Sequence, residues 1–334
     1  MKVSTKVAAA VALALAANVA FASKDCQPGE TVIKFSHVTA AVGHPKGEAA
    51  AQLAERVNKE MDGKVCMQVF PNKQLYNDKK VLEAMLLGDV QMAAPSLSKF
   101  EKYTKKMRIF DLPFMFKDMG AVDRFQQSAA GQKLKDSMRG KGLQGLAFWH
   151  NGMKQLSANR PLVNPSDAAG RKFRIMSSDV LKAQFEALAA NPQKMAFSEV
   201  YSSLQTGVVD GQENTWSNIY TKKFFEVQDG VTESNHGVLD YLVVTSTEFW
   251  DGLPGDVQGQ LATILAEVTA DANSKAGAIN AANRQKIIDA GKEVRQLNDA
   301  QRGAWVDALK PVWKQFEKDV GADMIDAAQK ANQG

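Results

Sequence analysis

Predicted strands and helices alternate along most of this chain. Thr31–Ser36 has the alternating apolar pattern of a strand, and His44–Met61 follows as an amphipathic helix with Gly63 just past its end. Lys64–Phe70 is predicted to return as a strand that ends at Pro71. Because strands that alternate with helices form parallel sheets through crossover connections, this pattern favours an α/β fold.

One further helix and strand complete the first run. Asn77 or Asp78 is expected to cap a helix that extends to Leu87. Gly88 ends this helix before a strand predicted over Val90–Ala94. The resulting β-α-β-α-β run contains enough elements for one lobe.

A second run of alternating elements begins near Leu146. Its predicted strands are Leu146–Trp149, Lys154–Ala158, Lys172–Met176 and Val208–Gly211, and its predicted helices are Val180–Ala189 and Ser198–Thr206. A helix–glycine–strand unit occurs at Met85–Val90 and again at Leu204–Val209, which suits two lobes of similar construction. Tyr241–Thr245 is predicted to be a strand that returns to the first lobe.

The chain is predicted to be helical beyond Pro254. Apolar residues such as Val257 and Leu261 recur at helical spacing, and the helix is expected to continue past Gly277 towards Ile288. A helix of about 30 residues spans about 45 Å. It is therefore long enough to lie across two lobes.

The N-terminus has the pattern of a secretory signal peptide. Lys2 and Lys6 precede an apolar run over residues 7–21, and Ala20 and Ala22 supply the small residues that a signal peptidase requires. Cleavage is expected after Ala22, which would leave a soluble, exported protein. The alternative is an N-terminal anchor that is not cleaved.

Charge and length restrict the class of protein further. The formal net charge is +4, and loss of the two lysines of the signal peptide lowers it to +2. Nothing in the sequence resembles the basic stripe of a nucleic-acid-binding surface, so no nucleic-acid partner is expected. A mature chain of about 310 residues is longer than a single hydrophobic core usually accommodates, which predicts two domains.

The chain contains two cysteines, Cys26 and Cys66. An even number of cysteines in an oxidising compartment favours a disulfide. Cys26 lies just before the first predicted strand and Cys66 lies in the second, so a bridge is expected if those strands are neighbours. Two buried free thiols are the alternative.

Motifs of cofactor binding and catalysis are absent or occur in the wrong context. Gly140–Gly145 reads G-x-G-x-x-G, but it follows a helical pattern and precedes a strand, so it is interpreted as a helix end and turn. His37, His44, His150 and His236 lack metal-binding spacing, so no metal or other cofactor is expected. The lack of a nucleophile elbow or of paired catalytic carboxylates favours a binding protein over an enzyme.

The segment Met195–Gln228 contains an unusual concentration of polar residues at a predicted strand end. Gln212, Glu213, Asn214 and Trp216 are better suited to holding a ligand than to transforming it.

Arg174 is the most informative charged residue. It lies within the apolar alternation Phe173–Met176, where its guanidinium would face the interior or a cleft. A buried cation without a partner is costly, and the planar guanidinium can pair with both oxygens of a carboxylate. A ligand carboxylate and a structural ion pair with a nearby Asp or Glu are both compatible with the spacing. Trp149, Trp216 and Phe197 are either pocket walls or core residues.

Several motifs in this order resemble a known family. They are I-K-F-S-H-V (Ile33–Val38), P-N-K-Q-L-Y-N-D (Pro71–Asp78), F-D-L-P-F-M-F (Phe110–Phe116), W-H-N-G-M-K-Q (Trp149–Gln155), G-R-K-F-R-I-M (Gly170–Met176), the segment Met195–Gln228 and S-N-H-G (Ser234–Gly237). The chain resembles the periplasmic solute-binding subunit of tripartite ATP-independent periplasmic (TRAP) transporters, and specifically the group that binds four-carbon dicarboxylates.

This resemblance implies a two-lobe α/β periplasmic binding protein fold with a hinge and one long helix that crosses both lobes. Residues 1–22 are then the signal peptide. Residues 23–151 and 240–279 form the first lobe, and residues 152–239 and 280–334 form the second, with the ligand cleft between them.

The resemblance also implies roles for individual residues. Arg174 matches the family arginine that pairs with the ligand carboxylate, and Asn214 matches another ligand contact. Lys154 stands where many members have a second arginine. Ser96 stands where sialic-acid binders have a glutamate. After Asn214 this chain has a threonine and then Trp216, whereas sialic-acid binders have proline directly after the asparagine. Both differences favour a small acid over a sugar acid.

The expected ligand-binding residues are His37, Ser96, Lys154, Arg174, Phe197, Asn214, Trp216 and His236, with Phe197 packed near Arg174. Gln212 and Glu213 are expected to have hinge or scaffold roles. The implied function is capture of succinate, malate or fumarate by a monomer and delivery to a permease driven by an ion gradient. The alternatives are a related protein for another organic acid (a 2-oxoacid, sugar acid or aromatic acid), an exported enzyme that acts on a carboxylate, and a ligand-sensing partner of a membrane receptor kinase.

Overall fold

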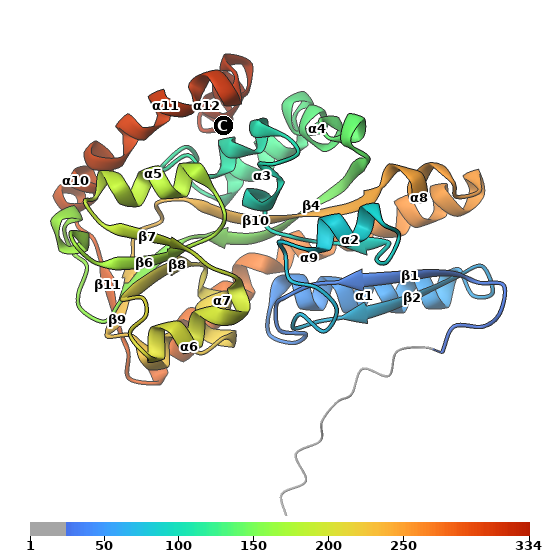
Figure 1. Cartoon of the computed structure of the whole chain (residues 1–334), viewed down its shortest axis with the longest axis horizontal. Helices are drawn as coiled ribbons and strands as arrows, with labels where there is room; N and C mark the ends of the chain where they lie inside the picture. The colour runs from blue at the N-terminus through green and yellow to red at the C-terminus, as the bar shows by residue number, and fades with distance from the viewer. Residues whose placement is uncertain (1–24) are drawn as a thin grey trace, which may run out of the picture.

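Two β-sheets organise the computed structural model, which describes residues 25–334 (Figure 1). The predicted signal peptide, residues 1–22, lies outside the described residues. The first sheet has the strand order β2-β1-β3-β10-β4, with β1 Thr31–Ser36, β2 Val65–Phe70, β3 Met92–Ala93, β4 Leu143–Met153 and β10 Val238–Ser246. β1 is parallel to β2 and β3, whereas β10 is antiparallel to β3 and β4.

The second sheet has the order β11-β9-β5-β8-β6-β7. Its strands are β5 Gln155–Ala158, β6 Lys172–Ile175, β7 Asn191–Lys194, β8 Gly211–Asn214, β9 Gly230–Glu233 and β11 Glu293–Gln296. Each sheet with its covering helices forms one lobe, so the predicted two-lobe α/β architecture is confirmed. The sheets are mixed rather than wholly parallel, because strands that cross between lobes pair in the antiparallel sense.

The helices cover the sheets and connect them. They are α1 Pro45–Glu60, α2 Val81–Leu86, α3 Met119–Gln127, α4 Ala129–Asp136, α5 Asp179–Ala187, α6 Val200–Gln205, α7 Trp216–Thr221, α8 Thr247–Asp251, α9 Gly255–Asp289, α10 Asp299–Leu309, α11 Trp313–Val320 and α12 Ala322–Ala331. The long helix expected after Pro254 is confirmed as α9, which has 35 residues and packs against α1 and β4 and also against α7. None of the helices in residues 25–334 is long and apolar enough to cross a membrane.

Two chain crossings run side by side between the lobes. β4 continues through Lys154 into β5, and β9 leads through 234–237 into β10. The Lys154 backbone N–H donates to the Gly237 carbonyl at 2.8 Å, which joins the two crossings. Asn280 of α9 donates to the Asn151 carbonyl at 2.7 Å and accepts from the Ser217 N–H at 2.9 Å. The long helix is thus attached to both lobes at the hinge.

The predicted strand Val208–Gly211 is wrong, because the strand at this place is β8, Gly211–Asn214. Two adjacent valines favoured the earlier position, but strand propensity is a weak preference that sheet pairing overrides. Val208 is 55% exposed, and Asn214 pairs with Gln155 of β5. The polar residues therefore form the buried strand itself rather than its end.

Other predicted boundaries shift. The helix assigned to 77–87 begins at Val81, because the Asn77 side chain accepts from the N–H groups of Lys79 and Lys80 in a turn before α2. The strand Val90–Ala94 shortens to β3, whereas Leu146–Trp149 extends to the 11 residues of β4. Gly140–Gly145 runs from the end of a short 3₁₀ helix through a turn at Gly142 into β4, which agrees with its interpretation as a helix end and turn.

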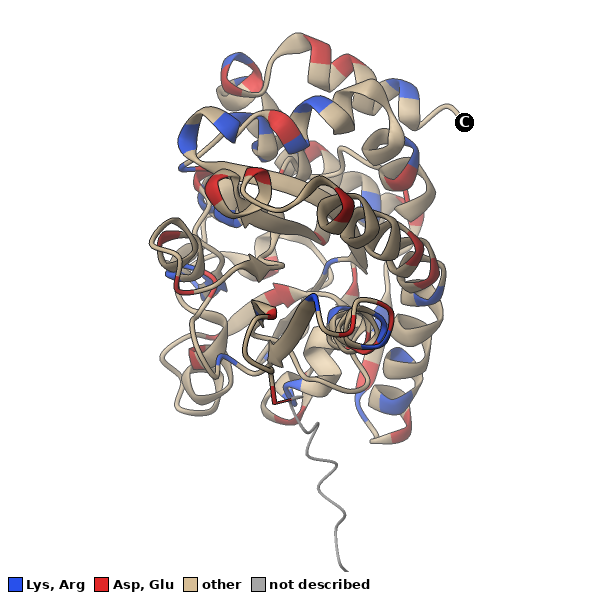
Figure 2. Cartoon of the chain, turned by 90° about the vertical axis from the view of Figure 1, so that its right-hand side faces the viewer, with Lys and Arg blue, Asp and Glu red and all other residues tan. Residues whose placement is uncertain are grey.

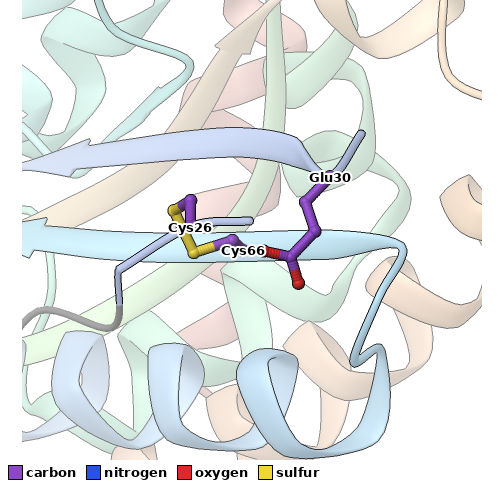
Figure 3. Close-up of side chains that lie close together, drawn as sticks. All are labelled: Cys26, Glu30 and Cys66. Atoms are coloured by element: carbon purple, nitrogen blue, oxygen red, sulfur yellow. A yellow bond between two sulfur atoms is a disulfide. The ribbon is translucent and has the colours of Figure 1, made fainter. Parts of the chain in front are cut away.

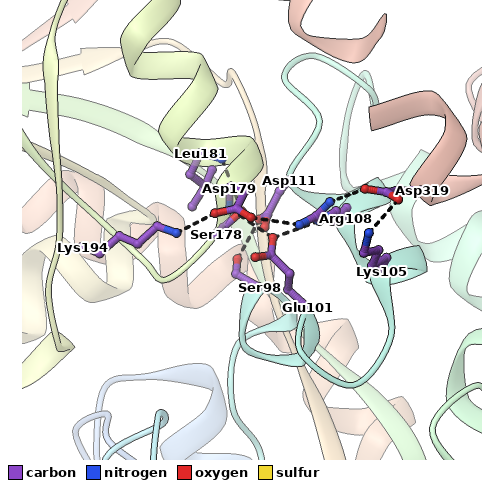
Figure 4. A network of polar contacts seen from close by, with 10 residues as sticks. All are labelled: Ser98, Glu101, Lys105, Arg108, Asp111, Ser178, Asp179, Leu181, Lys194 and Asp319. Carbon is purple, nitrogen blue, oxygen red and sulfur yellow. Dashed lines mark hydrogen bonds and ion pairs between the residues drawn. The ribbon is translucent and has the colours of Figure 1, made fainter. Parts of the chain in front are cut away.

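Polar contacts also link the lobes outside the hinge (Figure 4). Arg108 lies in the 3₁₀ helix η2, Lys105–Phe110, and donates to Glu101 at 3.0 Å and to Asp179, the first residue of α5, at 3.1 Å. It also donates to Asp319 of α11 at 2.5 Å. Lys194 of β7 pairs with Asp179 at 2.7 Å. Arg108 therefore connects an element that follows β3 with the second lobe.

Acidic and basic residues are interspersed along the helices (Figure 2). Many are paired, such as Arg56 with Glu60 along α1 and Lys182 with Glu186 along α5. Exposed pairs of this kind contribute little to stability. The intermixed charge is consistent with the small formal net charge of +4.

The predicted disulfide between Cys26 and Cys66 is confirmed (Figure 3). The two Cα atoms are 5.5 Å apart, and Cys66 lies opposite Val32 in the β1–β2 ladder. Glu30 lies beside the disulfide and accepts hydrogen bonds from the N–H groups of Gln27 and Gly63. The sulfurs are bonded to each other, so this group of Cys26, Glu30 and Cys66 does not supply thiolates to a metal.

Replacement of both cysteines by serine should lower the free energy of unfolding by about 3–4 kcal/mol, because the bridge restricts the unfolded chain over a sequence separation of 40. Chemical denaturation with and without reductant measures this effect. Reductant should destabilise the wild type and leave the double-serine variant unchanged. Equal stability of the wild type with and without reductant would contradict the prediction.

Candidate functional site

A small cavity of ≈ 20 Å³ lies between the lobes. The first lobe contributes Val38, Thr39, Asp78, Ser96, Lys99, Leu239 and Tyr241, and the second contributes Arg174, Met176, Phe197, Asn214 and Asn218. Several of these residues follow the carboxyl ends of β1, β3 and β6 or end β8, which is where ligands collect in α/β folds. Both lobes enclose the space, so entry of a larger ligand requires them to part.

Arg174 lines this cavity from β6 and is 2% exposed. Its Nε and Nη2 both donate to the Met195 carbonyl, at 3.2 and 3.0 Å. Within residues 25–334 its guanidinium forms no ion pair, and Nη1 has no hydrogen-bond acceptor. Burial lowers the pKa of Arg174 to about 10, although the negative charge of Glu213 acts to raise it. The side chain therefore stays cationic at neutral pH.

Asn214 presents a fixed amide to the same cavity. Its Oδ1 accepts from Asn218 Nδ2 at 2.7 Å, and its Nδ2 donates to Gln212 Oε1 at 2.9 Å. Asn218 Oδ1 in turn accepts from His44 Nε2 at 2.9 Å. Burial, with the charge of Lys46 adding to it, lowers the pKa of His44 to about 3, so this imidazole is a neutral donor. The second Nδ2 proton of Asn214 remains available to a ligand.

The other walls are aromatic, aliphatic and weakly polar. The Phe197 ring lies 5.8 Å from the Arg174 guanidinium carbon, as the family resemblance implies. Ser96 Oγ is 3.2 Å from the sulfur of Met176, which places these two residues across the interlobe space. Asp78 is the acidic residue among those that line the cavity.

Lys154 and His236 meet at Glu213, in a buried cluster at the hinge. Lys154 Nζ donates to Glu213 Oε1 at 2.9 Å, and His236 Nε2 donates to Glu213 Oε2 at 2.8 Å. Ser234 Oγ contacts His236 Nδ1 at 2.7 Å, and Lys154 is 0% exposed. Burial raises the pKa of Glu213, but the lysine charge and the histidine hydrogen bond outweigh it and hold the pKa at about 2.

Two other expected site residues lie outside the cavity lining. His37 is buried after β1, where its Nδ1 contacts Thr39 Oγ1 at 3.1 Å and burial lowers its pKa. Trp216 lies under the Arg284 guanidinium, with 5.6 Å between the guanidinium carbon and the ring centroid. It lines a separate hollow of ≈ 1130 Å³ along α9 and β4. Trp149 is a core residue that stacks on Phe35.

Four of the expected residues therefore line the cavity: Ser96, Arg174, Phe197 and Asn214. Sequence reasoning missed Lys99, Asp78 and Tyr241 as lining residues. Lys99 lies three positions after Ser96 in a 3₁₀ turn, which was not predicted. Asp78 was interpreted only as a helix cap, and Tyr241 only as a strand residue.

Substitution of Glu213 by glutamine should lower the free energy of unfolding by about 3–5 kcal/mol, because it leaves the buried Lys154 ammonium without its anion. The double variant Glu213→Gln/Lys154→Met should recover much of this loss in a double-mutant cycle. Chemical denaturation measures both.

The Glu213 carboxylate also predicts that the stability of the protein depends on pH. The folded-state pKa of Glu213 is depressed from 4.5 to about 2, so its contribution is present above about pH 4.5 and is lost as the pH falls towards about 2. The stability difference between wild type and Glu213→Gln should shrink over this interval. A difference that stays constant from pH 5 to 2.5 would show that the carboxylate is not held in this way.

Comparisons with known proteins agree with this architecture. The family model of bacterial extracellular solute-binding proteins, family 7, matches residues 35–319. The C4-dicarboxylate-binding periplasmic protein DctP of Vibrio cholerae is 65% identical over 312 residues, which cover 93% of this chain and 94% of the relative. The protein of the same name from Shewanella loihica is 56% identical, with 93% of each chain covered.

A solved structure has a similar fold over most of this chain. The TRAP periplasmic solute-binding protein from Shewanella oneidensis with bound succinate has a TM-score of 0.89 and 53% identity, and the match covers 91% of this chain and 99% of the other. The chain therefore belongs to family 7 of the bacterial extracellular solute-binding proteins, a family of binding proteins rather than enzymes.

Proposed function

We propose that this protein is the periplasmic solute-binding subunit of a TRAP transporter that captures a four-carbon dicarboxylate such as succinate, malate or fumarate. It delivers this ligand to a membrane permease driven by an ion gradient. The dicarboxylate-binding names of the similar proteins and the succinate bound to the Shewanella oneidensis structure support this ligand class.

The main support for this proposal is that Arg174 is buried and has no carboxylate partner among the described residues. A guanidinium that is 2% exposed and lacks a carboxylate partner within residues 25–334 is strongly unfavourable unless an anion binds it. Its two hydrogen bonds to the Met195 carbonyl hold the planar group in one orientation and leave Nη1 without an acceptor among the described residues. A ligand carboxylate bound there replaces the missing counter-ion.

Each expected site residue has a place in this proposal. Arg174 binds one carboxylate, Asn214 donates an amide proton, Ser96 offers a hydroxyl, and Phe197 packs against the guanidinium. Lys154 and His236 act through Glu213, because their polar groups are hydrogen-bonded to it at the hinge. His37 and Trp216 support the walls around the cleft from buried positions.

Closure of the lobes is the proposed binding step. A ligand that contacts both lobes shifts the equilibrium towards the closed form by its higher affinity for that form. Exclusion of water then strengthens the charge-assisted hydrogen bonds at Arg174. Contacts between the lobes away from the ligand, such as Arg108 to Asp179 at 3.1 Å, stabilise the same closed arrangement.

Substitution of Arg174 by alanine should weaken succinate binding by roughly 30-fold or more, because loss of one partner of a buried charged hydrogen bond costs about 2–5 kcal/mol. Arg174→Lys should bind more weakly than wild type, since lysine keeps the charge and loses the planar fork. Isothermal titration calorimetry with succinate, malate and fumarate measures these affinities.

Arg160→Ala is a matched control, because Arg160 is an exposed arginine of the same lobe. Its affinity should equal that of the wild type. Unchanged binding by Arg174→Ala would remove the arginine from the proposed site. Binding of a sugar acid or a 2-oxoacid in preference to all three dicarboxylates would favour the related organic-acid function instead.

A further inference from the structure

The cavity is lined by a second cation, Lys99, which the first lobe contributes. Lys99 belongs to the 3₁₀ helix η1, Leu97–Phe100, which directly follows β3 of the first lobe. Leu97 and Phe100 are buried, so the turn that presents Lys99 is held by the core of that lobe. Arg174 comes from β6 of the second lobe. The two cations therefore line one small space from different lobes.

The Lys99 ammonium has no bonding partner in the described part of the protein. Within residues 25–334 it forms no hydrogen bond and no ion pair. The other lysines near the cleft are already bonded: Lys46 Nζ donates to the Ala94 carbonyl at 2.8 Å, Lys222 Nζ to Asn72 at 2.8 Å, and Lys154 Nζ to Glu213 at 2.9 Å. Lys99 is thus the lysine of the cavity lining, and its ammonium remains available to a ligand anion.

We propose that Lys99 binds the second carboxylate of the ligand, so that a dicarboxylate joins the first lobe at Lys99 to the second lobe at Arg174. This inference rests on the proposed dicarboxylate-binding function and adds the residue that distinguishes a dianion from a monoanion. It replaces Lys154 in that role, because binding of a ligand by Lys154 would break the buried ion pair at the hinge.

Electrostatics explain why two carboxylates are required for closure. Burial lowers the pKa of Lys99 to about 8, and repulsion by Arg174 contributes to the same shift. Closure without ligand brings these like charges into one poorly solvated space, and the nearby carboxylates Asp78 and Asp111 offset only part of that cost. A dianion neutralises both cations, whereas a monoanion leaves one of them unpaired.

Calorimetry with succinate and butyrate tests the assignment, because the two ligands share a four-carbon chain and differ in the second carboxylate. Wild type should prefer succinate strongly. Lys99→Met should lose roughly 30-fold or more in succinate affinity and change little towards butyrate, so that its preference for succinate falls at least about tenfold. Lys99→Arg should retain most of the succinate affinity, and Lys80→Met, at an exposed lysine of the same lobe, should match wild type.

Two measurements on folded protein complete the test. Small-angle X-ray scattering should show contraction of wild type with succinate and less contraction of Lys99→Met at saturating succinate. Wild-type succinate affinity should fall as the pH rises above about 8, where Lys99 loses its proton, and Lys99→Arg should lack this fall. The groups that face Lys99 are Arg174, Lys79, Asp78 and Asp111. Arg174 has a pKa of about 10 and therefore keeps its charge as the pH rises past about 8.

The outcomes separate this inference from the function on which it rests. If wild type binds succinate and Lys99→Met binds it equally well, the lysine has no role in recognition. If Lys99→Met loses succinate and butyrate to the same extent, Lys99 acts on the site as a whole and not on the second carboxylate. If wild type binds none of the dicarboxylates, the proposed function and this inference both fail.

Discussion

The buried contact between Lys154 and Glu213 supports the arrangement of the whole molecule. It lies where the β4–β5 crossing runs beside the crossing that leads into β10, and His236 from the second crossing completes it. A buried ion pair of this kind is maintained only when hydrogen bonds satisfy its remaining polar atoms. The same strand that carries Glu213 ends in Asn214, so the hinge and this cavity-lining amide share one short element, β8.

The cleft combines fixed geometry with unpaired charge. Arg174 is oriented by the Met195 carbonyl, and Asn214 by Asn218 and Gln212, so the protein itself fixes these two cavity-lining groups. The protein supplies no counter-ion for Arg174 within residues 25–334, which leaves that role to a bound anion. The contrast between Lys154, which is paired with Glu213, and Lys99, which has no partner in the described part of the chain, explains how the two lysines take different roles.

Much of the fold could be predicted from local pattern. The spans of β1 and α1 agree with their predicted ranges to within one residue at each end, because alternation, a capping residue and a following glycine act over short distances. The polar strand β8 was misplaced, because its stability comes from pairing with β5 and β6 and from buried side-chain bonds, which local propensity does not report. The predicted lobe boundaries at 151/152, 239/240 and 279/280 remain a prediction.

The sequence by itself predicted the two-lobe α/β architecture, the long helix and Arg174 as a cation within an apolar run, because these follow from chain length, from periodicity and from one charge among apolar residues. Two cysteines favoured a disulfide, but the pairing of β1 with β2 is what brings Cys26 and Cys66 together. Only the tertiary structure decided which polar residues face the cavity. Lys154 and Lys99 carry the same charge, and their roles depend on whether a carboxylate from elsewhere in the chain lies within hydrogen-bonding distance. That distance is a property of folded neighbours, and sequence spacing does not contain it.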